Sequence, residues 1–371
     1  MSKQELNIAI LSPSQNAYSE TFIQAHKNLL KGTIYYYYGS LSNMKLEGKG
    51  EILKGKKRLL LKAVDKIKGA NYYAEKQALL QSLKNNKIDI ILAEYGTTAA
   101  LFIDVIKESK IPLIIHFHGY DASKYETIKQ FKHEYIQMFD YAKYVVSVSN
   151  VMYQKLLDLG CPKEKLINNT YGPNNIFFNN APDFSKQQFI AIGRFTDKKA
   201  PYFTIMAFSR VLKEFPEAKL VMAGNGHLLN VCQNLVNYYN IVKSVEFTGV
   251  IKPEEFLQYL ESSLAFVQHS ITAKNGDMEG TPLAVLESSA AGLPVISTYH
   301  AGIPDVIQHE TTGFLVKEHD VEMMANYMKK LLEDNQLAHK MGHAGRQNIK
   351  EHFSMNRHID VLNQLLRKAL K

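Results

Sequence analysis

The sequence predicts an α/β fold made of two facing, doubly wound, Rossmann-like domains with a cleft between them. Short apolar segments rich in β-branched and aromatic residues alternate with helical patterns along the chain, which is typical of parallel sheets covered by helices. The alternation stops at one polar, proline-containing stretch and then restarts. In addition, 371 residues exceed what one hydrophobic core usually supports. We therefore expect two domains of ordinary size.

The N-terminal domain is expected over residues 1–175, the linker over 176–187 and the C-terminal domain over 188–353. Strands of the N-terminal domain are predicted at 6–11, 33–38, 88–94, 112–117, 143–149 and 165–170, with helices at 19–31, 71–86 and 97–108. Strands of the C-terminal domain are predicted at 188–193, 218–223, 244–248, 263–267 and 293–298.

The last segment, 354–371, predicts one further helix. Its apolar residues, among them Ile359, Leu362 and Leu366, recur on one helical stripe. Since it has no evident place in the second sheet, we expect it to pack back across the hinge. Ligands of open α/β sheets bind beyond the carboxyl ends of the strands, so the expected cleft is the place to look for a site.

Composition places the chain among ordinary globular proteins. Apolar residues make up 46% and charged residues 22% of it. Cys161 and Cys232 have neither metal-ligand nor redox spacing, which favours free thiols in a reducing cytosol. The apolar start, Leu6 to Leu11, is typical of a first strand and not of a signal peptide, and no apolar run is long enough to span a bilayer. A cytoplasmic protein is expected.

Positive charge is concentrated in residues 45–76, where ten Lys or Arg side chains face four acidic ones, out of a net charge of +8 for the chain. Apolar residues between Leu59 and Ile67 recur there at helical spacing, as in a basic helix on an anionic membrane. A peripheral location at the inner face of the membrane is one interpretation; a solvated basic helix covering its own domain is the other. Nucleic acid is not an expected partner, because no nucleic-acid motif accompanies the charge.

The most specific motif runs from Asp277 to Glu287 and continues as Ser-Ser-Ala-Ala-Gly-Leu-Pro. Thr281 is a favoured N-cap and Pro282 a favoured first helical residue, so a helix is predicted to start here. Its first backbone N–H groups, near Leu283, would form an anion site. Glu287 lies among apolar neighbours, where a carboxylate is either hydrogen-bonded or costly. An ordinary surface helix start is the alternative.

Two glutamates eight positions apart, with Gly-x-Pro after the first and Ala-x-Gly-x-Pro-Val after the second, resemble the signature of the retaining GT-B glycosyltransferases of family 4. The resemblance implies that Glu279 lies beside the donor sugar. It also implies that Glu287 accepts hydrogen bonds from the ribose hydroxyls. The helix start at Thr281, Pro282 and Leu283 would then hold phosphate.

Arg194 and Lys199, five positions apart on a predicted strand-to-helix turn, can converge on one anion. By the same resemblance they match the diphosphate-binding pair of the family, with Lys198 the less expected partner. Taken alone, such a pair could be a solvated basic loop. Gly224 and Asn225, after the second strand of this domain, resemble the family's Gly-x-Gly turn, where a side chain would crowd the nucleotide. Val250 resembles the position whose backbone lies against the base.

In the N-terminal domain, His116-Phe-His118-Gly119 ends a predicted strand. Both histidines would share one face of an extended strand, but only His118 directly precedes the glycine turn. The resemblance implies that His118 lies beside the donor sugar; a structural histidine is the alternative. Zinc binding by the pair is not expected, because no further Cys or His cluster supports it.

The loop Ser12 to Phe22 lacks the adjacent glycines of many family members. In this loop and in Glu94-Tyr-Gly, His118-Gly and Gly276-Asp-Met-Glu, the sequence is similar to the subgroup that builds bacterial exopolysaccharides of the colanic-acid type. Because the loop from Ser12 to Phe22 departs from the family's common pattern, the sequence defines the residues that bind the acceptor less well than those that bind the donor.

These observations together predict an enzyme that transfers a hexose-type sugar, with retention, from a UDP- or GDP-sugar to a glycan or lipid-linked acceptor. UDP is the favoured nucleotide, and no metal or additional cofactor is expected, since the sequence has no Asp-x-Asp motif to hold a metal. Two alternatives stay open at this point: an epimerase of nucleotide sugars with the same fold, and a non-catalytic protein that binds nucleotide sugars.

Overall fold

The computed structural model describes residues 5–15, 20–54 and 72–371 of the chain. It divides into two compact units, the first made of the residues up to Asn169 together with His358–Lys371 and the second of Thr170–Arg357. The first unit therefore ends before residue 175, and the residues expected as a linker lie in the second unit. Each unit contains a sheet and helices, so the predicted α/β class is confirmed.

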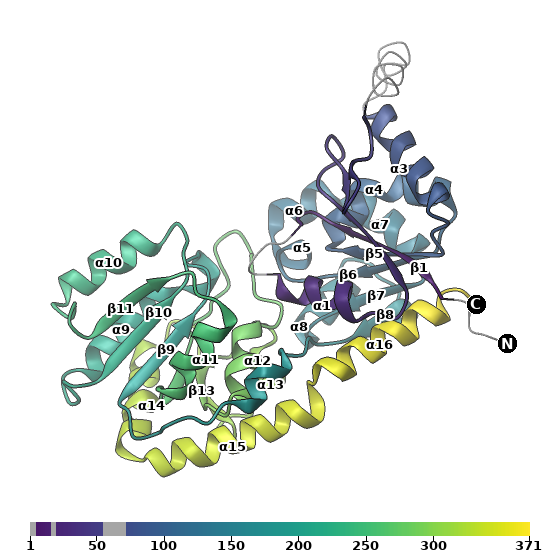
Figure 1. Ribbon diagram of the computed structural model, residues 1–371. Coiled ribbons are helices and arrows are strands. Elements are labelled where there is room, and N and C mark those ends of the chain that lie inside the picture. The colour runs from purple at the N-terminus through teal and green to yellow at the C-terminus, as the bar shows by residue number, and fades with distance from the viewer. Residues whose placement is uncertain (1–4, 16–19, 55–71) are drawn as a thin grey trace. The chain divides into compact units, whose positions relative to one another are not determined.

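The first unit is built on a sheet in the order β4-β3-β2-β1-β5-β6-β7-β8. Its strands are β1 Asn7–Ser12, β2 Thr33–Tyr38, β3 Lys45–Leu46, β4 Gly50–Glu51, β5 Ile90–Glu94, β6 Leu113–His116, β7 Tyr144–Ser147 and β8 Leu166–Asn168. Its helices are α1 Thr21–Leu29, α3 Tyr73–Asn85, α4 Gly96–Ser109, α5 Tyr120–Ser123, α6 Tyr125–Gln130, α7 Lys132–Tyr141, α8 Asn150–Asp158 and most of α16 Met355–Lys368. The neighbouring strands in the part of this order that runs β2-β1-β5-β6-β7-β8 pair in parallel. Helix α4 packs against α3 and α7 (Figure 1).

The central strands of this sheet are apolar on both faces because helices cover both. Every residue of β5, Ile-Ile-Leu-Ala-Glu, and of β6, Leu-Ile-Ile-His, is buried. Both strands nevertheless end in a polar residue, and these two residues, Glu94 and His116, are paired in register. The carboxyl edge of the sheet thus begins with buried polar side chains.

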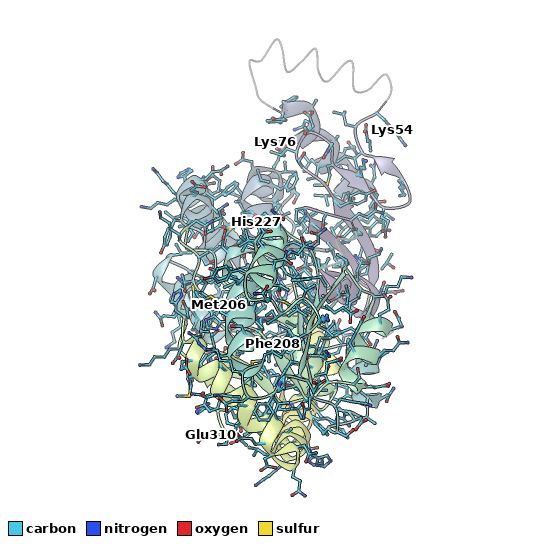
Figure 2. All side chains as sticks on the ribbon, turned by 90° about the vertical axis from the view of Figure 1, so that its left-hand side faces the viewer. Lys54, Lys76, Met206, Phe208, His227 and Glu310 are labelled. Carbon is cyan, nitrogen blue, oxygen red and sulfur yellow. The ribbon has the colours of Figure 1, made fainter. Side chains whose placement is uncertain are left out.

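One edge of the sheet is antiparallel, which the sequence did not predict. After β2 the chain forms the short strands β3 and β4 within residues 45–54, the start of the basic segment. The residues expected to form its basic helix, 59–67, lie outside the described residues. Lys54 precedes and Lys76 follows them in the sequence, and both are labelled in Figure 2. Lys76 Nζ is 2.7 Å from Asp104 Oδ2 in its own unit.

The second unit is built on a parallel sheet in the order β11-β10-β9-β12-β13-β14. Its strands are β9 Gln188–Ile192, β10 Lys219–Ala223, β11 Val245–Gly249, β12 Ala265–Val267, β13 Val295–Thr298 and β14 Gly313–Val316. Its helices are α9 Pro201–Val211, α10 Leu229–Tyr238, α11 Pro253–Glu261, α12 Leu283–Ala290, α13 Ile303–Val306, α14 Val321–Glu333 and α15 Asn335–His352.

The strand order reverses direction between β11 and β12, so right-handed crossovers put α9 and α10 on one face and α11 and α12 on the other. Helix α14 packs against α9, and α15 packs against α12 (Figure 1). Phe208 of α9, labelled in Figure 2, is fully buried in the core of this unit. Such a reversal leaves a crevice beyond the strand ends next to β9 and β12.

Strand β14, Gly-Phe-Leu-Val, was not predicted, because four residues show too little of any periodicity. The two cysteines, which the sequence analysis expected to be free thiols, are both free and buried: Cys161 and Cys232. Among the residues described, no helix is both long enough and apolar enough to cross a membrane.

Candidate active site

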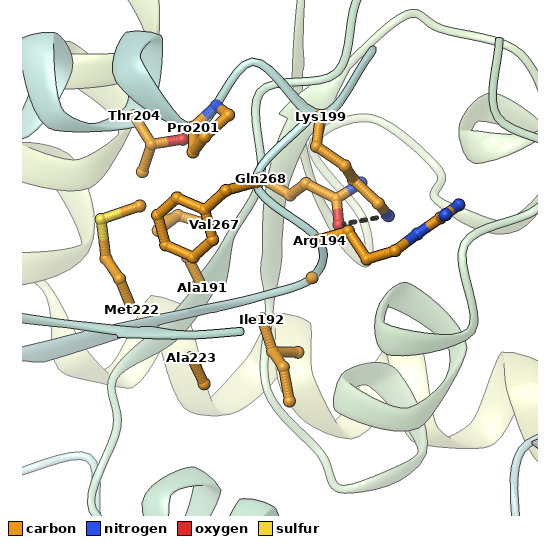
Figure 3. Close-up of a pocket in the computed structure, with 12 residues that line it drawn as sticks. Ala191, Ile192, Arg194, Lys199, Pro201, Thr204, Met222, Ala223, Val267 and Gln268 are labelled. Carbon is orange, nitrogen blue, oxygen red and sulfur yellow. Dashed lines mark hydrogen bonds between the residues drawn. The ribbon is translucent and has the colours of Figure 1, made fainter. Parts of the chain in front are cut away.

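The loop after β9 brings two cations to the carboxyl edge of the second sheet. Arg194, Lys199 and Gln268 line a pocket with a cavity volume of about 30 Å³. Its inner wall is apolar, with Met222 and Val267 among the lining residues (Figure 3). Arg194 is exposed, whereas Lys199 is partly buried and its Nζ donates to Gln268 Oε1 at 3.2 Å. The structure thus places both cations beside one cavity.

The side chain of Glu279, 9% exposed, lies next to Lys199. The distance from Lys199 Nζ to Glu279 Oε2 is 3.4 Å. Burial by itself would raise the pKa of Glu279, but nearby cations, Lys199 first, lower it to about 2. The other oxygen, Oε1, is buried and accepts no hydrogen bond from any residue that the structure describes. Since buried carboxylate oxygens normally have a donor, Oε1 marks a place where a ligand hydroxyl could donate.

Lys198 holds the loop that carries Glu279. Its Nζ donates to Asp277 Oδ1 and to the Met278 carbonyl, both at 3.0 Å, and its side chain is buried. Lys198 therefore uses its ammonium group to hold this loop. Lys199 is the lysine that lies at the pocket beside Arg194.

His300 and Glu318, which the sequence analysis did not single out, fix the same loop from the other side. The backbone N–H of Glu279 donates to His300 Nε2 at 3.2 Å, and His300 Nδ1 is 2.7 Å from Glu318 Oε1. Burial lowers the pKa of His300, which favours the neutral ring. Because Nε2 accepts, the proton is on Nδ1 and points to Glu318. A fixed tautomer thus positions the main chain of Glu279.

Helix α12 begins one residue later than the sequence predicted. Leu283 is its first residue and Pro282 its cap, with ψ at 121°, and no side chain caps it, so the assignment of Thr281 as N-cap is wrong. Proline fixes φ but not ψ, so Pro282 can end an extended loop as well as begin a helix. The N–H groups of Leu283 and Ala284 donate to none of the described residues. Backbone N–H groups of this kind at a helix start are suited to binding an anion.

Glu287, within α12, is partly buried, and no cation among the described residues pairs with its carboxylate. Burial raises its pKa to about 7. A carboxylate in this state gains from any ligand that donates hydrogen bonds to it.

Stability should depend on pH through Glu287. Its pKa rises from 4.5 in the unfolded chain to about 7, so the folded state holds the proton more tightly. The stability from this proton is complete below about pH 4.5 and is lost as pH rises through about 7, up to about 3 kcal/mol. Glu287→Gln should flatten the pH dependence of the unfolding free energy in urea between about pH 5 and pH 8. Glu217→Gln, at an exposed position, should not. Equal pH dependence in the Glu287 variant and the wild type would contradict the assignment.

Gly224, Asn225 and Val250 lie at the ends of β10 and β11. Gly224 has φ at 132°, and a Cβ there would lie 2.0 Å from the Gly193 carbonyl oxygen. The protein's own backbone therefore excludes a side chain at this position, so the predicted reason, crowding of a nucleotide, was incomplete. The Asn225 carbonyl accepts from Phe195 N–H at 2.9 Å, and Val250 is half exposed. Asn225 thus ties the turn after β10 to the turn after β9.

In the first unit, His118 lies in a turn that Asp121 holds. The Asp121 carboxylate accepts from the backbone N–H groups of Gly96 at 2.9 Å, His118 at 3.1 Å and Gly119 at 2.8 Å. Gly119 has φ at 154° with ψ at −91°, a conformation that glycine adopts readily. His118 Nε2 is 2.8 Å from Glu94 Oε2, and both side chains are buried. The turn thus holds the imidazole in one orientation.

Glu94 has two further histidines near it. His26 Nδ1 is 2.7 Å from Oε1, and His116 Nδ1 is 3.7 Å from Oε2. His26, Glu94 and His116 each offer one ligand atom within 4.8 Å of the others, an arrangement that could hold a metal ion. Two atoms bound to one tetrahedral zinc at about 2.1 Å would be about 3.4 Å apart. The 2.7 Å separation is that of a hydrogen bond, so we interpret the group as hydrogen-bonded.

Comparisons with known proteins identify the family. The model of "Glycosyl transferases group 1" matches residues 174–348, and that of "Glycosyltransferase Family 4" matches residues 62–167. The amylovoran biosynthesis glycosyltransferase AmsK of Erwinia amylovora is 30% identical over 73% of this chain and 67% of its own length. This chain is a family 4 glycosyltransferase. The putative colanic acid biosynthesis glycosyltransferase WcaL of Escherichia coli (strain K12) is 28% identical to the transferase, over 76% of this chain and 71% of WcaL.

The transferase has the GT-B fold, as predicted. Alr3699/HepE of Anabaena, solved with UDP and glucose, matches it with a TM-score of 0.76 at 15% identity, over 98% of this chain and 99% of that one. A glycosyltransferase of Rickettsia africae matches it with a TM-score of 0.76 at 18% identity over 100% of both chains. The named relatives are transferases, so neither the epimerase nor the non-catalytic alternative is favoured.

Sequence reasoning gave no role to Glu94, His300 or Glu318, although it cited Glu94 within the motif Glu94-Tyr-Gly. Glu94 gave one readable signal, a carboxylate at the end of the otherwise apolar run Ile-Ile-Leu-Ala. His300 and Glu318 gave no such signal, because only the folded chain brings His300 to Glu279 and Glu318 to His300. Their neighbours in sequence carry no pattern that predicts the contact.

Proposed function

We propose that this transferase moves a hexose-type sugar, with retention and without a metal ion, from a nucleotide diphosphate to a glycan or lipid-linked acceptor during exopolysaccharide assembly. The observation that carries the proposal is that the cations of Arg194 and Lys199 line one pocket and that the carboxylate of Glu279 lies 3.4 Å from Lys199 Nζ. The available amides of Leu283 and Ala284 add an anion site to the same unit.

Bond cleavage places negative charge on the leaving diphosphate. Arg194, Lys199 and the amides at the start of α12 would stabilise that charge more in the transition state than in the ground state. These groups supply positive charge where a metal would otherwise be needed. Glu279, held ionised by Lys199, would position the sugar through Oε1 and stabilise positive charge on the ring. We assign it no covalent role; retention then follows from attack on the same face as departure.

UDP is the favoured nucleotide, and Glu287 is proposed to accept hydrogen bonds from its ribose. HepE, which shares the fold, was solved with UDP and glucose. GDP remains the other candidate, because a relative from Mycobacterium tuberculosis, 30% identical over 43% of this chain, is named as a GDP-mannose-dependent mannosyltransferase. The names of WcaL and AmsK support a polysaccharide product. A lipid-linked acceptor and a peripheral membrane location rest on the charge of residues 45–76 alone.

Thermal unfolding in the presence of nucleotides tests the donor site. UDP at a hundred times its Kd should stabilise the folded protein by about 2.7 kcal/mol, and GDP at the same concentration by less. UMP should stabilise less than UDP, since it lacks the second phosphate that the cations would bind. The rise in Tm should persist in EDTA.

The next step is mass spectrometry of cell-envelope glycolipids incubated with the matching nucleotide sugar. A product heavier by one hexose supports the proposal. No stabilisation by either nucleotide, or a strict need for Mg²⁺, would contradict the donor site as proposed. An epimer of the donor formed without acceptor would revive the epimerase.

A further inference from the structure

The ammonium group of Lys199 lies between two acceptors of different charge. Its Nζ donates to the amide oxygen of Gln268 at 3.2 Å, the dashed line in Figure 3, and lies 3.4 Å from the carboxylate Oε2 of Glu279. An ammonium group has three hydrogens and no acceptor. No other described residue accepts a hydrogen bond from it, so one hydrogen is left for a ligand of the pocket that Lys199 and Gln268 both line.

The orientation of the Gln268 amide follows from the chemistry of its two partners. If the amide were turned around, its NH₂ group would face the ammonium of Lys199, donor against donor, so the oxygen must face the lysine. The NH₂ group then lies on the other side, where Nε2 donates to Ser270 Oγ at 2.8 Å. Gln268 is only 5% exposed and Ser270 is fully buried, so little water competes for either side chain. The amide thus has one favoured orientation.

Strand β13 holds the main chain on both sides of this amide. Ser297 Oγ donates to the Gln268 carbonyl and Thr298 Oγ1 donates to the Ser270 carbonyl, each at 2.6 Å. The Gln268 N–H donates to the Ile296 carbonyl at 3.0 Å. Both hydroxyl-bearing residues of the strand are fully buried. Because its main chain and its amide are both fixed, Gln268 presents its oxygen at one place before any ligand binds.

A neutral acceptor suits this position better than a second carboxylate. Burial lowers the pKa of Lys199, and the positive charges of Lys198 and Arg194 act in the same direction. Glu279 opposes them. A hydrogen bond accepted from the ammonium also favours its charged form. The Gln268 amide supplies such a bond without adding negative charge, whereas a carboxylate in its place would repel an anion in the pocket.

We propose that Gln268 is a positioning residue that holds the Lys199 ammonium in place, so that its remaining hydrogen is directed at the diphosphate of the donor. The proposal rests on the proposed function, in which Lys199 binds that diphosphate. Gln268 acts only through Lys199. A direct hydrogen bond from Gln268 to the nucleotide is the competing interpretation, because Gln268 also lines the pocket.

A double-mutant cycle in Gln268 and Lys199 separates the two interpretations. Gln268→Met keeps the approximate length of the side chain and removes its acceptor and its donor. In calorimetry, its UDP affinity should be about tenfold below wild type and its UMP affinity within about twofold, since UMP lacks the second phosphate. In a Lys199→Ala background the same change should alter UDP affinity by less than about twofold, because the residue through which it acts is absent. An unchanged UDP affinity in Gln268→Met, or an equal loss in both backgrounds, would overturn the proposal.

The matched control is Gln233→Met. This is the same replacement at an exposed position of α10. Its affinities for UDP and UMP, and its Tm without ligand, should equal those of the wild type. A tenfold loss of UDP affinity in this control would show that the loss in Gln268→Met is not specific to the pocket.

The charge state of Lys199 gives a measurement that needs no nucleotide. In ¹H–¹³C spectra of the lysine side chains, the Lys199 signal is assigned by its loss in Lys199→Ala. It should titrate at lower pH in Gln268→Met than in the wild type, because the charged form loses an acceptor. Gln268→Glu supplies a charged acceptor, so there the signal should titrate at higher pH, which tests the contact even if Gln268→Met does not fold. Equal titration in the wild type and both variants would overturn the proposal.

The two measurements also distinguish the proposal from the function on which it rests. If neither UDP nor GDP binds the wild type, the proposed function fails, while opposite shifts of the Lys199 titration still show that Gln268 holds the ammonium. If UDP binds and the losses in the cycle are additive, only the role of Gln268 fails.

Discussion

Glu279→Gln is expected to lower the rate of sugar transfer by about a hundredfold or more. The amide keeps the shape of the side chain but removes the negative charge that would stabilise a positive sugar ring. Burial already lowers the pKa of Lys199, and loss of its carboxylate partner should lower it further. The measurement is initial-rate kinetics with saturating donor, together with calorimetry of nucleotide binding, which should change less than kcat.

Glu254→Gln is the control for this change. Glu254 lies exposed in the first turn of α11, so the same chemical replacement there should leave transfer and Tm near wild type. Turnover by Glu279→Gln within about threefold of wild type would remove Glu279 from the reaction.

Arg194→Ala should reduce transfer by a similar factor, about a hundredfold, by removing a donor aimed at the leaving diphosphate. Unlike Glu279→Gln, it should also weaken binding of UDP, since the diphosphate is present before the bond breaks. Arg194 is exposed and takes part in no ion pair with a described residue, so Tm without ligand should change little. Calorimetry should be done with both UDP and UMP. If Arg194 contacts the second phosphate, the ratio of UDP affinity to UMP affinity should be smaller in Arg194→Ala than in the wild type.

Arg210→Ala on α9 is the matched arginine replacement. Arg210 pairs with Glu322 at 3.1 Å in the same unit, on the outer helix layer. That variant should keep its affinity for UDP. A normal UDP-to-UMP affinity ratio in Arg194→Ala would show that its guanidinium does not contact the diphosphate.

The sequence was sufficient for the parts of the molecule that local patterns determine. Strands such as β5 and β10 have continuous apolar runs and appeared within two residues of their predicted bounds. The pocket cations and Glu279 were singled out through the resemblance of their motifs to those of family 4. Short or ambiguous elements did not: β3 and β4 have two residues each, and Pro282 fits either a loop end or a helix start.

Contacts between distant residues account for the rest of what was missed. His26 and His358 are 332 positions apart, and no local pattern links them. The same holds for His300, whose partners Glu279 and Glu318 lie on different loops. The partners of these histidines become apparent only in the folded structure, where the sheet brings the ends of its strands together. Lys198 and Lys199 illustrate the limit at short range, since neighbouring lysines with the same chemistry bind different carboxylates, Asp277 and Glu279.

The division of the chain at Asn169 and Arg357 has a practical consequence for dissecting this enzyme. The second unit is one uninterrupted stretch, 170–357, so a single fragment contains all of it. The other half is discontinuous. A truncation that stops before His358 would deprive it of Ile359 and Leu362, which are buried, and would leave an apolar surface exposed to aggregation. To obtain that half in isolation, the terminal helix would have to be rejoined to the earlier residues by circular permutation.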